Sequence, residues 1–151
     1  MCPRSQHHAR RGATTLEFAA TCPIALFLVL APMVGGLGAF RYQQVASLAR
    51  EGARWASVHG SEYARETGQP AATSEDIFNN AILPAAVALN PDKLTYTVSW
   101  NENNDPLTVY ENYERPTGNT VTVQVTYTWF PEAYLVGPFT LTSTSTSQML
   151  Y

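Results

Sequence analysis

Few residues of this chain have the type and spacing that catalysis or metal binding requires. The three histidines are His7, His8 and His59, and none lies at a spacing from cysteine or aspartate that is typical of a zinc site. Acidic residues gather at positions 102, 105, 111 and 114, but their spacing does not match a calcium loop of the EF-hand type and indicates solvated loop charges. Nucleophile elbows and phosphate-binding loops are absent from the sequence. The sequence therefore predicts no catalytic residues, no metal ligands, no cofactor and no small-molecule substrate, and a protein that is not an enzyme.

One carboxylate, Glu17, stands at the head of a long apolar run. From Phe18 to Phe40 there are 23 residues without a charged side chain or a histidine. About 20 helical residues cross the hydrocarbon core of a bilayer, so this run predicts a transmembrane helix. A carboxylate there is costly unless it is paired, although it gains from the helix dipole near a helix N-terminus.

The residues before the apolar run form a recognisable pattern, Arg-Arg-Gly-Ala-Thr-Thr-Leu-Glu-Phe over positions 10–18. A glycine that follows a basic leader and precedes a glutamate by five positions resembles the processing site of type IV prepilins. The resemblance implies cleavage by a prepilin peptidase between Gly12 and Ala13, which would leave the apolar helix on the mature protein. It also gives Glu17 and Phe18 a role in processing and assembly. Glu17 either pairs with the new amine of Ala13, its own or a neighbour's, or simply rests at the lipid interface.

A second pattern, Leu-Ala-Arg-Glu-Gly-Ala-Arg at positions 48–54, resembles the segment that follows the membrane helix in TadE-like proteins. These are the pseudopilins of tight-adherence pilus systems, and the likeness covers about residues 10–58. It implies other pilins or pseudopilins and the pilus assembly machinery as partners. Arg50, Glu51 and Arg54 are then candidates for a subunit contact, or otherwise a solvated helix face.

Charge is distributed unevenly along the chain. Residues 1–12 carry three arginines and no acid, whereas residues 61–151 carry three basic and ten acidic residues, a net charge of −7. The positive-inside rule predicts a cytoplasmic N-terminus and an extracytoplasmic C-terminal domain, in the bacterial inner membrane if the resemblance holds. The acidic domain also excludes nucleic acid as a partner. Cys2 and Cys22 lie in the leader and the apolar run, so neither can cross-link the distal domain.

The remaining elements follow from periodicity. The apolar stripe of Val45, Leu48, Gly52, Trp55 and Ala56 predicts that the helix continues to about Gly60. Polar residues 61–72 indicate a loop, and Thr73 with Asp76 indicates the start of a short helix that runs to about Leu83. Pro84 disfavours the helical state at Leu83, with residues 85–89 as the stretch over which the helix could resume. Alternation with period two predicts strands, which lie at residues 94–100, 107–110, 121–129 and 139–150. On these strands Tyr96, Trp100, Tyr127 and Trp129 are interpreted as core residues, with a glycan-binding surface as the alternative.

These predictions combine into an α+β, pilin-like fold in which a long N-terminal helix packs on a small, mostly antiparallel sheet. The organisation predicted is a basic leader at 1–12, a transmembrane helix at 13–40, its continuation at 41–60 and an extracytoplasmic domain at 61–151. The function predicted is that of a TadE-like pseudopilin, a membrane-anchored minor or assembly subunit of a tight-adherence (type IVb) pilus or secretion system. The alternatives are a plain signal-anchored envelope protein with a small binding domain unrelated to pili, and a cleaved signal peptide, whose apolar region is usually shorter.

Overall fold

A computed structural model describes residues 9–101, 104, 119–131 and 137–149, and of residues 9–13, 61, 62 and 65 it describes the backbone alone. The chain divides into two compact units, Met1–Gly38 and Ala39–Tyr151. One helix, α1 (Ala9–Val58), contributes to both units. The two units differ in where their apolar residues lie: at the surface in the first unit and in a core in the second.

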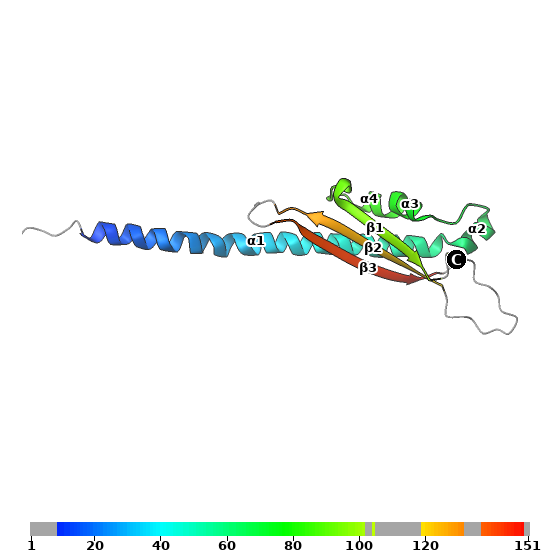
Figure 1. The fold of residues 1–151 in the computed structure, drawn as a ribbon, viewed down its shortest axis with the longest axis horizontal. Helices are drawn as coiled ribbons and strands as arrows, with labels where there is room; N and C mark the ends of the chain where they lie inside the picture. Colours follow the sequence, from blue (N-terminus) through cyan, green and yellow to red (C-terminus); the bar gives the residue numbers. More distant parts are fainter. Residues whose placement is uncertain (1–8, 102–103, 105–118, 132–136, 150–151) are drawn as a thin grey trace, which may run out of the picture. The chain divides into compact units, whose positions relative to one another are not determined.

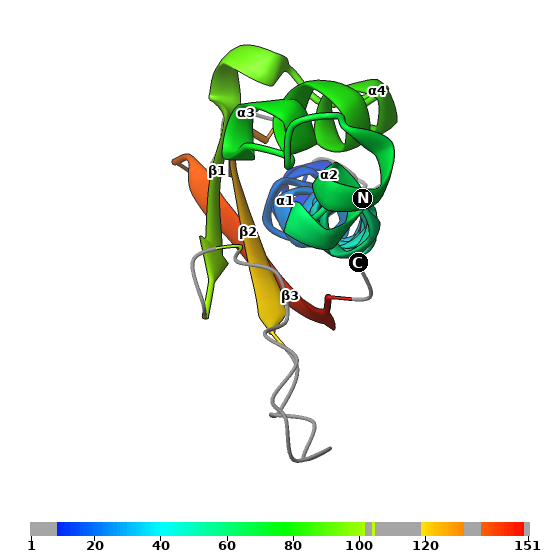
Figure 2. The same ribbon diagram turned by 90° about the vertical axis from the view of Figure 1, so that its right-hand side faces the viewer.

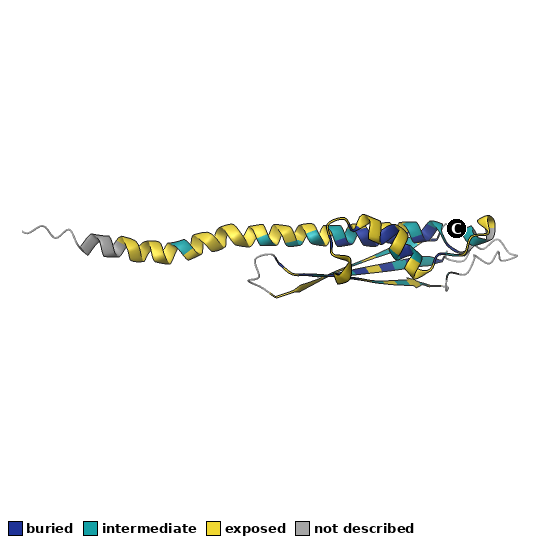
Figure 3. Ribbon diagram, turned by 90° about the horizontal axis from the view of Figure 1, so that it is seen from above, coloured by how far each residue is buried: buried dark blue, intermediate teal, exposed yellow. Residues whose placement is uncertain are grey.

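The first unit consists of the N-terminal part of α1. Its large apolar side chains are exposed, among them Phe27 and Leu28 at 72% and 69% of their full accessible area. Figure 3 shows this part of the helix as an almost continuous exposed run. Pro23 and Pro32 both lie inside the helix. By length and composition, α1 is the one described helix that could cross a membrane, and its most apolar window is entirely unburied.

The second unit is built on a three-stranded antiparallel sheet in the order β1 (Leu94–Trp100), β2 (Thr120–Trp129), β3 (Phe139–Gln148) (Figure 1). These strands confirm the predicted α+β class and three of the four predicted strands. The fourth, predicted at residues 107–110, lies outside the described residues.

The sheet has one apolar and one hydroxyl-rich face because side chains alternate along each strand. On β2 the valines at 121, 123 and 125 are fully buried. On the other face, threonines of β2 form hydrogen bonds with threonines of β3. Thr122 hydrogen-bonds Thr146 at 2.9 Å and Thr126 hydrogen-bonds Thr142 at 3.1 Å. A register slip of one residue would expose the valines, so burial of this face fixes the strand register.

Short helical segments connect α1 to the sheet. They are α2 (Ser61–Thr67), α3 (Ser74–Ile77), the π-helical turn η1 (Phe78–Ile82), α4 (Leu83–Ala85) and the 3-10 turn η2 (Pro91–Lys93). The predicted loop at 61–72 was wrong in its first half, because Gly68 takes a left-handed conformation (φ 72°) that ends a helix rather than belonging to a loop.

The predicted break at Leu83 was also wrong, because helical structure continues to Ala85, and the alternative of a helix resumed over residues 85–89 is not seen. A proline in a regular α-helix clashes with the carbonyl four residues earlier. Here Leu83 donates its N–H to the carbonyl of Phe78, five residues back, and this widened turn carries the helix past Pro84 into α4.

The predicted capping box at the start of α3 is present. The Thr73 hydroxyl accepts a hydrogen bond from the Asp76 amide at 3.2 Å, and the Asp76 carboxylate accepts one from the Thr73 amide at 2.9 Å. The Thr73 hydroxyl also donates to the same carboxylate at 2.6 Å. These hydrogen bonds, from the side chain and then the backbone of Thr73, lower the pKa of Asp76.

The core of the second unit lies between the apolar face of the sheet and the last turns of α1. Figure 2 looks along α1, with the sheet on one side and α3 and α4 on another. The buried hydrophobic residues of α1 are small or aliphatic, namely Val45, Leu48, Ala49, Ala53 and Ala56. Opposite them lie the β2 valines and the fully buried Ile77 and Ile82. The sheet therefore packs on the long helix, as the α+β prediction requires.

Candidate functional site

The predicted cleavage site lies inside α1. The helix begins at Ala9, so the backbone of Gly12 and Ala13 is already helical in the uncleaved chain. A cut between these two residues would remove the first helical turn and make Ala13 the first residue of the helix.

Glu17 and Phe18 are both exposed on α1. With the helix starting at Ala9, Glu17 lies about two turns inside it, where the helix dipole has little effect. The Thr21 hydroxyl donates a hydrogen bond to the backbone carbonyl of Glu17 at 2.9 Å, so this hydroxyl finds its partner within α1. A helix that began at Ala13 would bring the Glu17 carboxylate next to its first turn.

In the second unit the motif at 48–54 divides α1 into two faces. Arg50, Glu51 and Arg54 are exposed, on the same side as Gln43 and Ser47. The remaining motif residues are buried: Leu48 is 2% exposed and Ala49 is fully buried. The charged residues thus make no contribution to the core of their own chain, and their face of α1 is available to another molecule.

Gly52 is where the helix approaches its neighbours most closely. A Cβ atom at this position would lie 3.2 Å from both Ile82 Cγ1 and Val123 Cγ1. Such contacts are tighter than most Cβ atoms make, so any side chain at this position would require Ile82 and Val123 to shift. Gly52 was predicted on the apolar stripe, whereas Ala49 and Ala53 were not, although their spacing of four residues on one helix face is the signal that identifies them.

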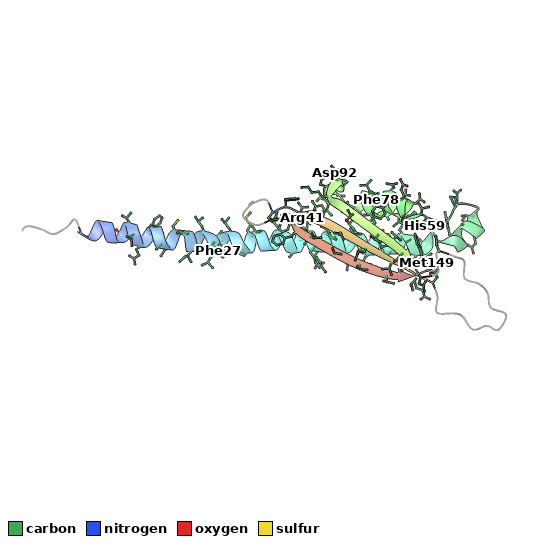
Figure 4. The ribbon with its side chains drawn as sticks, viewed as in Figure 1. Phe27, Arg41, His59, Phe78, Asp92 and Met149 are labelled. Atoms are coloured by element: carbon green, nitrogen blue, oxygen red, sulfur yellow. The ribbon has the colours of Figure 1, made fainter. Side chains whose placement is uncertain are left out.

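Two polar groups were not predicted, one at each end of the part of α1 that belongs to the second unit. Arg41 Nη1 donates to Gln44 Oε1 at 3.2 Å and to the carbonyl of Ala88, which ties α1 to the turn after α4. At the other end, His59 stacks on Trp55 with ring centroids 4.0 Å apart, and its Nδ1 lies 2.9 Å from the Trp55 carbonyl. Because a carbonyl can only accept, Nδ1 carries the proton and donates. Figure 4 shows Arg41 and His59 at opposite ends of the sheet.

The chemistry of a metal site is not assembled in the described part of the chain. No group of three or more His, Cys, Asp or Glu residues could hold an ion there. The acidic positions 102, 105, 111 and 114 lie outside the described residues. Of the four aromatic residues weighed as core or surface, Tyr127 and Trp129 are both 6% exposed, which confirms them as core. Tyr96 is half-buried and stacks on Phe78, with the two ring centroids 4.5 Å apart.

The comparison with known families concerns the N-terminal part of the chain. Residues 12–54 match the TadE-like protein family. The TadE-like segment starts at Gly12, includes the exposed apolar helix and ends at Arg54, so it confirms the resemblance drawn from the sequence. The family is associated with tight-adherence pili. No curated protein and no solved structure matches the chain.

Proposed function

We propose that the protein is a TadE-like pseudopilin, a minor or assembly subunit of a tight-adherence (type IVb) pilus or secretion system. It is anchored by α1 in the bacterial inner membrane, with its N-terminus in the cytoplasm and its second unit outside. The single observation that carries the proposal is the family match over residues 12–54. That segment begins at the glycine after which a prepilin peptidase would cut.

The position of Glu17 supports processing at this glycine. In the uncleaved helix the carboxylate lies too far from the helix start to gain from the dipole, and burying it in lipid is costly. A helix that starts at Ala13 supplies both a nearby positive helix end and a free amine. Cleavage would therefore supply a cationic partner for Glu17, in the same subunit or in its neighbour.

The exposed charged face of α1 supports a contact between subunits. Arg50 and Arg54 are one helical turn apart with Glu51 beside them, and none of the three is buried in its own chain. A neighbouring pseudopilin with an acidic surface would meet two cations at a fixed spacing. Such charges guide association and orientation more than they add affinity.

The processing step is tested by the intact mass of the protein extracted from membranes, with and without a co-expressed prepilin peptidase. The proposal predicts a start at Ala13 only when the peptidase is present, and no processing of Gly12→Leu. Gly36→Leu, in an open part of the same helix, is the control and should be processed normally. A start at Met1 in every sample would indicate a plain signal anchor. A start near residues 36–40 would indicate a secreted domain.

The subunit contact is tested by the double charge reversal Arg50→Glu with Arg54→Glu. We expect reduced recovery of partner pseudopilins after cross-linking in membranes, with unchanged folding, since both residues are exposed. Glu75→Lys, an exposed charge reversal on α3, is the control. Equal recovery of partners with all three chains would show that the charges are only solvated.

A further inference from the structure

One end of the second unit carries an unusual set of exposed apolar side chains. At this end β1 begins, β2 ends and β3 begins, as the pairs Leu94–Tyr127 and Trp129–Phe139 show (Figure 1). The first residues of the unit, from Ala39 onward, reach the same end through the hydrogen bond from Arg41 to the carbonyl of Ala88. The exposed apolar residues there are Phe40, Tyr42, Val87, Phe130 and Phe139, here called the collar.

The collar is too apolar for a surface that faces only water. Val87 is 90% exposed, and the four aromatic residues are between 42% and 57% exposed. The fold does bury an aromatic residue at this end of the sheet, because Trp129, the residue before Phe130, is buried. Large exposed apolar residues that gather in one place indicate a binding surface.

Cationic side chains accompany the collar. The Lys93 ammonium lies 4.3 Å from the centre of the Phe130 ring, so the ring and the cation are held together. Arg41 lies between Phe40 and Tyr42 in the sequence, and Asp92 is the described acid beside them. In the sequence, the link between β1 and β2, which joins the strand ends opposite the collar, carries four acidic residues, whereas the link between β2 and β3 carries one, Glu132.

Tyrosine, lysine and arginine occupy the interface of a bilayer, where an apolar body and a polar or charged tip are both satisfied, so Tyr42, Arg41 and Lys93 suit this position. The phenylalanines and Val87 of the collar supply apolar surface that lipid can cover. The chain itself points to this partner. Phe40 is both the last residue of the uncharged run from Phe18 and a member of the collar. A membrane that contains this run has its surface where the run ends.

We infer that the collar lies in the lipid interface of the membrane that α1 enters, so that the second unit is seated on the bilayer. The inference rests on the membrane anchor of the proposed function. Seating the unit in this way would fix its height above the membrane and present the charged face of α1 to neighbouring subunits at a constant level.

The test uses the full chain, with Cys2 and Cys22 replaced by Ala, in vesicles of mixed zwitterionic and anionic phospholipid. A fluorophore is attached at Val87→Cys in the collar, at Ser99→Cys near the opposite end of the sheet, or at Phe27→Cys in the apolar helix. All three positions are exposed. Quenching by brominated lipid reports contact between the label and the acyl chains.

We expect loss of fluorescence at positions 27 and 87 and none at 99. The loss at 87 should be reversed by Phe130→Ser with Lys93→Glu, while the loss at 27 persists and the circular dichroism spectrum is unchanged. Quenching at 27 without quenching at 87 would overturn the collar while leaving the anchor intact. No quenching at 27 would mean that the anchor itself is wrong. A change in the fluorescence of the label at position 87 that depends on the number of protein molecules per vesicle, and not on brominated lipid, would assign the collar to a contact with a second copy. That result would also overturn the inference.

Discussion

Two stretches of the same helix solve opposite problems. Between residues 18 and 38 the side chains of α1 are uncharged on every side and mostly exposed. Between residues 45 and 56 they are apolar on one side only, and that side is buried. A helix that is apolar all round needs an apolar environment from outside its own chain, whereas a one-sided helix can be satisfied by a sheet. The distribution of apolar residues around the axis, rather than their number, separates the anchor from the core.

The largest difference between the two units is expected when an aliphatic side chain is shortened in each of them. Ile82 is fully buried, so Ile82→Ala should lower the free energy of unfolding of the second unit by about 2–5 kcal/mol. Leu28 is 69% exposed, and Leu28→Ala should leave this unit unchanged. Urea unfolding of the full chain in vesicles, followed by near-ultraviolet circular dichroism, measures both. Equal effects of the two changes would contradict separate cores.

Two glycines of α1 allow a finer comparison. Gly52→Leu would force a side chain against Ile82 and Val123, and overpacking of this kind costs about 1–3 kcal/mol. Gly36→Leu meets nothing within 4 Å and should not destabilise the second unit. The same urea titration measures the difference. A stable Gly52→Leu protein would mean that the helix does not pack on the sheet as closely as described.

The smallest effect concerns the cap of α3. Thr73→Ala removes the hydroxyl that accepts the Asp76 amide, and loss of such a cap typically costs about 1 kcal/mol. A carboxylate whose folded pKa is lowered stabilises the fold above its unfolded pKa. The contribution of Asp76 should therefore be complete well above 3.8, its ordinary value, and be lost as the pH falls below it through the lowered pKa.

The pH dependence separates the cap from ordinary surface charge. Asp76→Asn should unfold more easily than the unchanged chain near neutral pH, and the two should converge in acid. Glu75→Gln, next to it and exposed, is the control and should show less convergence. Parallel curves for Asp76→Asn and the unchanged chain across the pH range would remove Asp76 from the cap.

The sequence predicts those parts of the molecule that local periodicity decides. Alternation of valine with threonine in β2 identifies both faces of the sheet, and the run from Phe18 to Phe40 identifies the candidate membrane helix. The capping box of α3 follows from two residues three positions apart. These features depend on neighbours in the chain, so they are visible without coordinates.

Other features depend on contacts between distant residues. The hydrogen bond from Arg41 to the carbonyl of Ala88 joins residues 47 positions apart, and no local sequence pattern predicts it. The close approach at Gly52 requires knowing that Ile82 and Val123 meet there. The widened turn before Pro84 was missed because a proline usually ends a helix. For the candidate site, the sequence identified the exposed charges of α1, while the structure showed which residues of the same motif are core.

The measurement that tests the two environments of α1 most directly is amide hydrogen exchange along the helix, in vesicles, at increasing urea. We predict that residues 45–56 lose protection when the sheet unfolds, while residues 18–38 keep theirs because lipid rather than the sheet surrounds them. Loss of protection by both stretches at the same urea concentration would contradict the account, since it would mean that one core supports the whole helix.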